Sequence, residues 1–464
     1  MKVKVQVQIE SNNSAEPVIE EIFDLTRDEL TPETLGLTLD EAKTLLANLQ
    51  AKFAESQTIE YVKNHRQCLH CGKTRATKDH HELVFRTLFG KLRLESPRFY
   101  TCDCQPQQQK SESPLAACLP DRTAPELKYL QTQWVALMPY GVTVKRLEDI
   151  LPIDQNVATL HRHVLAAGER VDNELGDEQP MFAHGCIAEW ESLPEPDPPL
   201  VVGIDGGYVH ARDGDNRKAG WFEVIVGKSM TADGDKKCFA FVADYNSKPK
   251  RRLYETLCSQ GLQMNQTVTF LSDGGDTVRD LQFYMSPFSE HLLDWFHITM
   301  RITVIRQMAK GLPKLKWLKG VEDNLERVKW FLWHGNVFMA LQVLDDIEGN
   351  LECLDDKQTT DKVRKFERTF GEFRTYIERN EGFIVNYRDR YFYGKAISTA
   401  FVESAVNQVI SKRMVKKQQM RWTKKGAHLL LQVRTRVIND EWRDIFHRWY
   451  PKMHSTEKTL QLAA

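Results

Sequence analysis

Long apolar runs are missing from this chain of 464 residues, and so is a secretion signal. No run is long enough to span a bilayer, which excludes a transmembrane helix. The first ten residues, MKVKVQVQIE, alternate polar and apolar side chains and lack the apolar core of a signal peptide. We therefore expect no membrane association and a location in the cytoplasm or nucleoid.

The number of cysteines is odd, so they cannot all be paired in disulfides within one chain. Nine cysteines without an export signal favour thiols or metal ligands over a disulfide framework. Cys68 and Cys71 form one close pair, and Cys102 and Cys104 form another after an expected hairpin over residues 83–98. Two such pairs suit a structural Zn²⁺ with four thiolate ligands, and four unrelated thiols are the alternative. The two histidines of the hairpin are alternative ligands or surface residues.

Acidic residues are absent from residues 411–436, although the whole chain has a net charge of −1. Cations neutralise DNA phosphates, and an aromatic ring can stack on a base displaced at a cleavage site. The segment therefore favours DNA contacts over the more usual solvated helix face. The residues expected to contact DNA are Lys412, Arg413, Lys416, Lys417, Arg421, Trp422, Lys424 and Lys425.

Two aspartates flanked by glycine pairs follow apolar runs that are typical of buried strands. Asp205 lies in LVVGIDGGY at residues 200–208, and Asp273 lies in VTFLSDGGD at residues 268–276. We expect the glycines to end both strands, so that each carboxylate faces a cleft. Asp276 competes with Asp273, which is preferred because it directly follows its strand. Two such carboxylates indicate a site for a hard cation such as Mg²⁺.

A third acid, Glu403, lies in AFVESAVNQVISKR, where apolar residues recur at helical spacing. The pattern predicts a helix that packs inward and carries Glu403 along its edge; a solvated helix residue is the alternative. Between the linker and residue 297 the expected order is three strands, a helix and two further strands. This order is typical of an RNase H-like fold, and charged helical sequence separates it from the Glu403 helix. The predicted fold class is multidomain α/β, with an RNase H-like catalytic core and a helical insertion.

Three helical patterns with short breaks precede the core and predict a helix-turn-helix. Thr159 and Arg162 lie on the outer side of its third helix and would meet DNA, whereas an ordinary helical bundle is the alternative. The expected segments are an N-terminal strand and helical part (1–60), a zinc-ribbon-like part (61–120), the helix-turn-helix (121–175), a linker (176–199), the first part of the core (200–297), the helical insertion (298–390), the Glu403 helix with the basic segment (391–436) and a C-terminal tail (437–464).

Several of these motifs together resemble the DDE transposases of bacterial insertion sequences, specifically the ISKra-type group. The resemblance covers nearly the whole chain after the first segment. It is carried by GIDGGYV at 203–209, LSDGGD at 271–276, LDWFHITMR at 293–301 and above all VESAVNQVISKRMVKKQQMRWTKKGAHLLLQVRT at 402–435. The resemblance implies that Asp205, Asp273 and Glu403 form the DDE triad.

Two further residues take roles from the same resemblance, and a third is a neighbour of Glu403. Asp294 and His297 match a D-x-x-H motif of related transposases, and Asn407 lies one turn after the third acid. We expect all three to support the site or to contact DNA. For His297, a packed and hydrogen-bonded position beside Trp295 is the alternative.

The implied chemistry is phosphodiester cleavage at the ends of an insertion sequence, followed by strand transfer into target DNA. The three carboxylates would hold two Mg²⁺ or Mn²⁺ ions roughly 3.5–4 Å apart. The implied partners are the terminal inverted repeats and target DNA, bound by a homodimer or higher oligomer. The alternatives are a DNA-binding regulator that no longer cuts and an RNase H-like nuclease.

Overall fold

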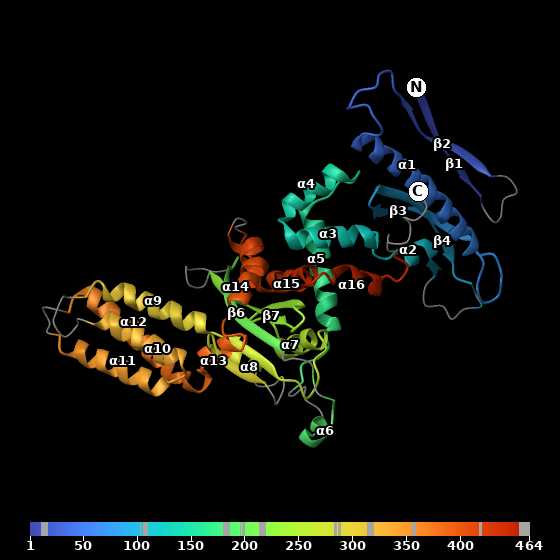
Figure 1. The fold of residues 1–464 in the computed structure, drawn as a ribbon. Helices are drawn as coiled ribbons and strands as arrows, with labels where there is room; N and C mark the ends of the chain where they lie inside the picture. Colours follow the sequence, from blue (N-terminus) through green and yellow to red (C-terminus); the bar gives the residue numbers. More distant parts are fainter. Residues whose placement is uncertain are drawn as a thin grey trace. The chain divides into compact units, whose positions relative to one another are not determined.

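The structure is a computed structural model that describes residues 1–10, 17–102, 104, 110–179, 186–194, 196, 200–212, 220–282, 285, 289–312, 320–354, 359–416 and 420–453. The chain is a mixed α/β protein and divides into two compact units. The first unit is Met1–Ala167 with Glu441–Ala464, and the second is Gly168–Asp440. Figure 1 traces the elements of both. In the described parts of the chain, every helix is too short or too polar to cross a membrane.

The first unit contains two antiparallel sheets and one long helix. Its strands are β1 (Lys2–Ile9) and β2 (Val18–Thr26) in one sheet, and β3 (Thr77–Thr87), β4 (Gly90–Tyr100) and β5 (Ser111–Glu112) in the other. Helix α1 (Leu39–Asn64) begins at a capping box between Thr38 and Glu41. Leu83 and Leu94 are paired across β3 and β4 and are buried in this unit's core. The expected hairpin is therefore present and is longer than residues 83–98.

Several helices complete the first unit. They are α2 (Pro114–Cys118), α3 (Pro125–Leu137), α4 (Tyr140–Ile150), the first part of α5 (Val157–Glu174) and α16 (Trp442–Trp449). The indole N–H of Trp442 donates to Oγ1 of Thr132 at 3.1 Å, and Arg443 pairs with Glu126 at 2.7 Å. Because these contacts fasten α16 to α3, the expected C-terminal tail includes a packed helix.

The second unit is built on a five-stranded sheet with the strand order β10-β9-β6-β7-β8. Strands β6, β7 and β8 are antiparallel, whereas β9 and β10 run parallel to β6. The expected strands and the helix after the third strand are present, and a further helix, α8, lies between the last two strands. The elements are β6 (Leu200–His210), β7 (Trp221–Met230), β8 (Lys236–Val242), α7 (Pro249–Cys258), β9 (Val268–Ser272), α8 (Asp276–Gln282) and β10 (Glu290–Leu293).

Helices pack on both faces of this sheet (Figure 1). On one face, Ile204 of β6 and Phe241 of β8 are buried in a cluster with Leu253 of α7. The other face packs on α14 (Ala400–Val406), the π-helix η3 (Asn407–Val415) and α15 (Lys424–Ile438). Strands that are buried on both faces read as continuous apolar runs, which explains their clear signal in the sequence.

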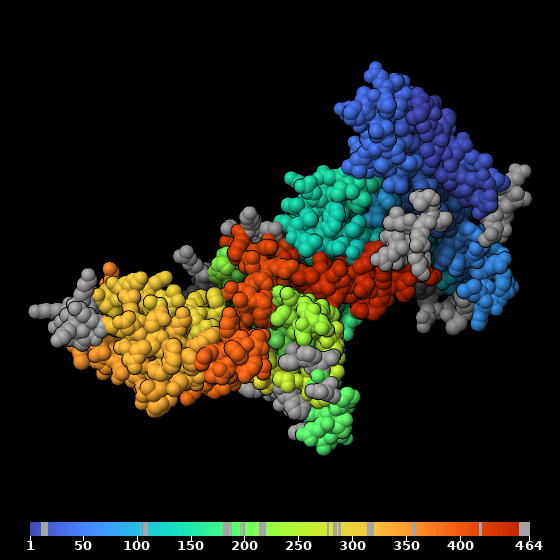
Figure 2. Space-filling model, viewed as in Figure 1, coloured from blue at the N-terminus to red at the C-terminus, as the bar shows by residue number. Residues whose placement is uncertain are grey.

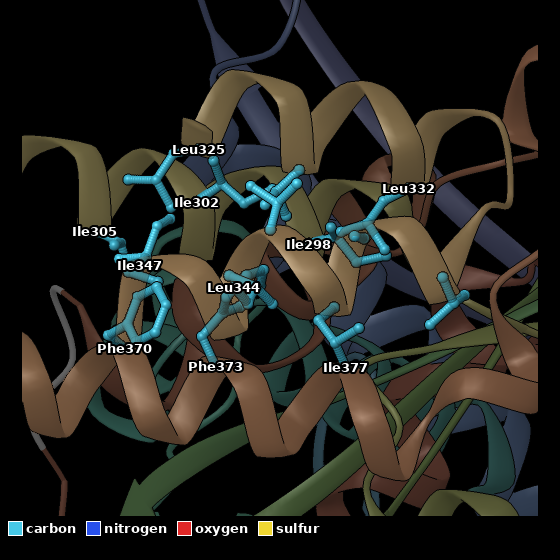
Figure 3. Packing of buried hydrophobic residues seen from close by; sticks show 14 of the residues in the cluster. Ile298, Ile302, Ile305, Leu325, Leu332, Leu344, Ile347, Phe370, Phe373 and Ile377 are labelled. Atoms are coloured by element: carbon cyan, nitrogen blue, oxygen red, sulfur yellow. The ribbon is translucent and has the colours of Figure 1, made fainter. Parts of the chain in front are cut away.

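A helical module lies between β10 and α14. Its elements are α9 (Trp295–Ala309), α10 (Val321–Trp333), α11 (Val337–Glu352), α12 (Asp361–Arg379), η2 (Glu381–Phe383) and α13 (Tyr387–Phe392). Figure 3 shows Phe370 and Phe373 of α12 on the side that faces Ile347 and Leu344 of α11. Each such buried side chain contributes about 1.5–3 kcal/mol. Leu293, the last residue of β10, belongs to the same cluster, so this core joins the module to the sheet. The module appears as a solid body in yellow and orange in Figure 2.

Candidate active site

Asp205 lies in the middle of β6 rather than at its end. The strand continues through the glycine pair to His210, which is aligned with Trp221 of β7. The prediction that the glycines end this strand is therefore wrong. The parallel ladder between β6 and β9 stops at Gly203, so Asp205 lies beyond the part of β6 that β9 covers. A carboxylate can reach open space there although its strand continues.

Glycines on the Asp205 face of β6 allow α14 and η3 to approach closely. A Cβ atom added at Gly203 would lie 2.0 Å from Cγ2 of Val402, and one added at Gly207 would lie 2.9 Å from Cδ1 of Ile410. Both glycines share the Asp205 face because strand side chains alternate. The physical role of these glycines is close packing of a helix, not termination of the strand.

Asp273 directly follows β9, as the sequence predicts. Its Oδ1 accepts a hydrogen bond from the N–H of Gly275 at 3.0 Å. In the parallel ladder Gly203 is aligned with Leu271. Continuing that register by two residues places Asp205 level with Asp273. Asp205 on β6 and Asp273 directly after β9 are therefore expected at the same edge of the ladder.

Glu403 is exposed on α14, next to the buried Val402. The helix continues as η3, which is a π-helix. π-Helices are rare, and those that do occur are often found at functional sites. Asn407 begins η3, and its Oδ1 accepts from Nζ of Lys416 at 3.1 Å. Among the described residues, the only metal-ligand group with ligand atoms within 4.8 Å of one another consists of cysteines, so the three acids do not form one. Asp276 begins α8, and its side chain lies outside the described residues.

Asp294 is buried and joins the start of α9 to the start of the Glu403 helix. Its Oδ1 accepts from the backbone N–H of Phe296 at 2.9 Å and of Thr399 at 3.1 Å. Its Oδ2 accepts from the Thr399 hydroxyl and pairs with Nδ1 of His297 at 2.8 Å. Because Thr399 directly precedes α14, this carboxylate positions both His297 and the helix that carries Glu403.

The charges of these groups influence one another. Burial raises the pKa of Asp205, and the Asp273 and Asp294 carboxylates raise it further, against a backbone hydrogen bond and the charge of His297. The hydrogen bond to Asp294 raises the pKa of His297, and the charges of Asp273 and Asp205 act in the same direction. Burial acts to raise the pKa of Asp294, but its hydrogen-bond donors leave that pKa below its ordinary value. The negative charges of Asp205 and Asp273 thus favour the protonated form of His297, and a divalent cation would stabilise both carboxylates.

Glu223 is an acid near the site that the sequence analysis missed. Its Oε1 lies 3.0 Å from the position of a Cβ atom added at Gly206. Burial raises the pKa of Glu223, and the charges of Asp273 and Asp244 add to this. The sequence carries no signal for Glu223, since its position near Asp273 depends on strand register.

Arg301 is a second charged residue that the sequence analysis missed. It lies on α9 four residues after His297, a spacing that brings helical side chains together. Its guanidinium carbon lies 4.1 Å from the ring centroid of Tyr376. Burial raises the pKa of Tyr376, against the charge of Arg301 and with a contribution from Asp273. This exposed cation therefore lies against a ring whose pKa the charge of Asp273 also influences, and its spacing from His297 was the available signal.

Two residues expected to contact DNA are buried instead. Arg413 and Trp422 are almost inaccessible to solvent, and the Arg413 guanidinium carbon lies 5.3 Å from the Trp422 ring centroid. The backbone N–H of Trp422 donates to the carbonyl of His210 at 2.8 Å, and the Trp422 carbonyl accepts from the backbone N–H of Arg212 at 2.9 Å. The prediction that Arg413 and Trp422 contact DNA is wrong, because both side chains are buried; the Trp422 backbone holds the segment against the end of β6, and Arg413 packs on the Trp422 ring.

The other described residues that the sequence predicts to contact DNA in this segment are exposed: Lys412, Lys416, Arg421, Lys424 and Lys425. Acids from distant parts of the chain neutralise some of their charge. Lys424 pairs with Asp244, and Lys425 pairs with Glu169 at 2.6 Å. Lys417 lies outside the described residues. The cations available to phosphates are thus fewer than the sequence suggests.

Thr159 and Arg162 lie on α5, within the first unit. Arg162 is exposed, whereas Thr159 is partly buried at the start of the helix. The Thr159 N–H donates to Oδ1 of Asn156 at 2.8 Å, a typical N-terminal cap. Leu160 and Val164 are buried, as the helical pattern predicts.

The four predicted cysteines come together in the first unit and could hold a metal ion, consistent with structural zinc. Their sulfur atoms all lie within 4.8 Å of one another; Sγ of Cys68 is 3.5 Å from that of Cys104, and Sγ of Cys71 is 3.4 Å from that of Cys102. Zinc–sulfur bonds of about 2.3 Å in a tetrahedron require sulfurs about 3.8 Å apart. The N–H groups of Cys71 and His70 lower the pKa of Cys68 to about 6, which favours the thiolate that binds metal.

Comparison with known proteins returned no matching family model and no match among curated proteins.

Proposed function

We propose that the protein is a DDE transposase of the ISKra type, which cleaves DNA at the ends of an insertion sequence and joins the freed ends to target DNA. One observation carries the proposal. Asp205 on β6 and Asp273, directly after the neighbouring parallel strand β9, come level when the ladder register is continued, and the helix of Glu403 packs on the Asp205 face of β6. This arrangement of two acids and of the helix that carries the third supports the proposal.

The topology of the second unit supports an RNase H-like core. Three antiparallel strands come first, and two strands parallel to the first are then added beyond it, with helices between them. The helical module separates this core from the Glu403 helix, as an insertion would. In the first unit, we assign the cysteine cluster to a zinc-ribbon-like part and α3 to α5 to a helix-turn-helix that binds the element ends.

Asp205, Asp273 and Glu403 would hold Mg²⁺ or Mn²⁺, because hard cations prefer carboxylate oxygens. Two such ions would activate the attacking oxygen and stabilise the leaving oxygen. The chain's own groups do the remaining work. His297, held by Asp294, donates its free ring N–H toward a phosphate, and Arg301 adds a positive charge for the DNA backbone.

A non-cleaving DNA-binding regulator is the second candidate function. It is favoured by the observation that the described ligand atoms of the three acids do not gather into one group. In the transposase, binding of the ions and DNA would draw Glu403 toward the two aspartates. The regulator would bind the same element ends without that movement and without cleavage.

The deciding experiment measures Mg²⁺-dependent cleavage and strand transfer on DNA that carries the inverted repeats flanking the gene. We expect activity in the wild type and none in Asp205→Asn, which removes one charge without changing size. Asp244→Asn is the matched control, since Asp244 pairs with Lys424, and it should retain activity. Tight binding without cleavage by the wild type would support the regulator. Light scattering on the same DNA complexes tests the expected dimer or higher oligomer.

A further inference from the structure

Exposed aromatic residues gather on α10 and α13 of the helical module. The exposed fraction is 58% for Trp330, 68% for Tyr391, 80% for Phe392 and 73% for Tyr393. Large apolar side chains on a surface mark binding sites when they cluster. These four residues, together with Trp333, are called the aromatic surface below.

A pocket makes the aromatic surface continuous. It has a volume of about 600 Å³ and is lined by Trp330, Trp333 and Trp295, with charged residues of α10 at its sides. The ring centroids of Trp295 and Trp333 are 4.9 Å apart, and those of Trp333 and Tyr391 are 6.0 Å apart. A row of rings therefore runs from the pocket to the exposed end of α13.

The charge around these rings favours an anionic ligand. Arg327 and Lys329 line the pocket, and Arg388 and Lys395 flank the exposed rings in the sequence; the exposed Asp389 beside them accepts a hydrogen bond from the side chain of Asn386. The acid of the pocket, Glu326, is paired with an arginine of α9. Aromatic rings interleaved with cations are the combination that binds single-stranded nucleic acid, because rings stack on bases while cations neutralise phosphates. A purely apolar partner would offer no negative charge to pair with these cations.

The aromatic surface borders the candidate active site. Trp295 directly follows Asp294, and its N–H donates to the carbonyl of Ile397 at 3.1 Å. Ile397 lies between the exposed rings of α13 and Thr399, which binds Asp294. A DNA strand whose phosphate reaches Asp205 can therefore extend over the aromatic surface.

We propose that the aromatic surface binds unpaired bases of single-stranded DNA next to the cleavage site. This rests on the proposed function, since it names how that site holds its substrate. It also reassigns a role: the sequence predicts base stacking by Trp422, which is buried, whereas the rings of α13 are accessible.

The test measures binding of the full-length protein to fluorescein-labelled oligothymidine, in Ca²⁺ so that no cleavage is needed. An abasic oligomer of equal length carries the same phosphates without bases. We expect the triple variant Tyr391→Ala, Phe392→Ala, Tyr393→Ala to bind oligothymidine more weakly by roughly 5- to 150-fold for each stacked base lost. Its binding to the abasic oligomer should stay at the wild-type level.

Two control variants separate stacking from charge and from general loss of apolar surface. Lys395→Ala should weaken binding to both oligomers alike. Phe53→Ala removes an exposed ring, with an exposed fraction of 59%, from α1 in the other unit and should change neither. The proposal is overturned if the triple variant binds oligothymidine like the wild type or loses affinity for both oligomers equally. It is also overturned if the triple variant only changes the oligomeric state, since the rings would then form a subunit interface. Base-dependent binding in a protein that never cleaves would support the aromatic surface and refute the transposase.

Discussion

A methyl group placed at Gly203 should displace the helix that carries Glu403. The added Cβ would lie 2.0 Å from Cγ2 of Val402 and 2.9 Å from Cζ of Phe401, distances that real atoms do not adopt. Val402 is fully buried, so it cannot rotate into solvent. Overpacking of this kind costs about 1–3 kcal/mol. With a urea m-value of about 3 kcal/mol/M, the unfolding midpoint should fall by roughly 0.3–1 M.

The effect on chemistry should exceed the effect on stability. Val402 and Glu403 are adjacent on α14, so a shift that relieves the contact also moves the carboxylate. A misplacement of about 1 Å in a catalytic group can cost about 100-fold in rate. Gly203→Ala should therefore lose most of its Mg²⁺-dependent DNA cleavage at a temperature where it is still folded, as measured by circular dichroism.

Gly206→Ala is the matched control because its side faces away from α14. Its added Cβ would lie 3.0 Å from Oε1 of Glu223, the end of a flexible side chain that can rotate away. We expect a change in unfolding free energy within about 0.5 kcal/mol and near-normal cleavage. Equal behaviour of the two variants, or wild-type stability and cleavage in Gly203→Ala, would refute the reasoning about close packing.

Three further predictions concern other parts of the chain. Cys71→Ser should bind less than stoichiometric zinc and lower the unfolding temperature of the first unit; metal analysis and calorimetry test this, and full zinc content would contradict it. The pKa of His297 is raised above its ordinary value of 6.5 by the pair with Asp294. The stability that the protonated imidazole contributes is therefore fully present below pH 6.5 and is lost as the pH rises through the raised pKa. The pKa of Asp294 is lowered below its ordinary value of 3.8. The stability that its carboxylate contributes is therefore present above pH 3.8 and is lost as the pH falls through the lowered pKa. Unfolding free energy measured against pH should therefore decline on the alkaline side in the wild type, and His297→Ala should lack that decline. Trp422→Ala should cost about 3–5 kcal/mol in unfolding free energy because the ring is buried, whereas the exposed Lys412→Ala should cost at most about 0.5 kcal/mol and only weaken DNA binding. A stable Trp422→Ala protein that binds DNA poorly would restore the original prediction for this residue.

Periodic patterns predicted most elements of the second unit. The strands at Asp205 and Asp273 and the helix at Glu403 are present, because alternating and helical apolar patterns reflect local burial. The glycine pair after Asp205 misled the prediction of the strand's end. A glycine that ends a strand and a glycine that admits a neighbouring helix look identical in sequence, and only the position of Val402 against Gly203 distinguishes them.

Burial of charged and aromatic residues was the second point that local patterns did not predict. Arg413 and Trp422 belong to a run of cations, and a run of this kind predicts exposure to solvent. Their burial depends on the end of β6, more than two hundred residues earlier in the chain. Glu223 likewise gains its position near Asp273 from the pairing of strands.

The sequence by itself determined the order of helices and strands, the two cysteine pairs and the acids that follow or lie within buried strands. These features depend on residue type, spacing and burial along a single element. The tertiary structure alone decided that Asp205 and Asp273 lie level, that Asp294 fastens His297 to the start of the Glu403 helix, and which cations and rings face solvent. The physical reason is that register and packing join residues distant in the chain, and no local pattern encodes which of them will meet.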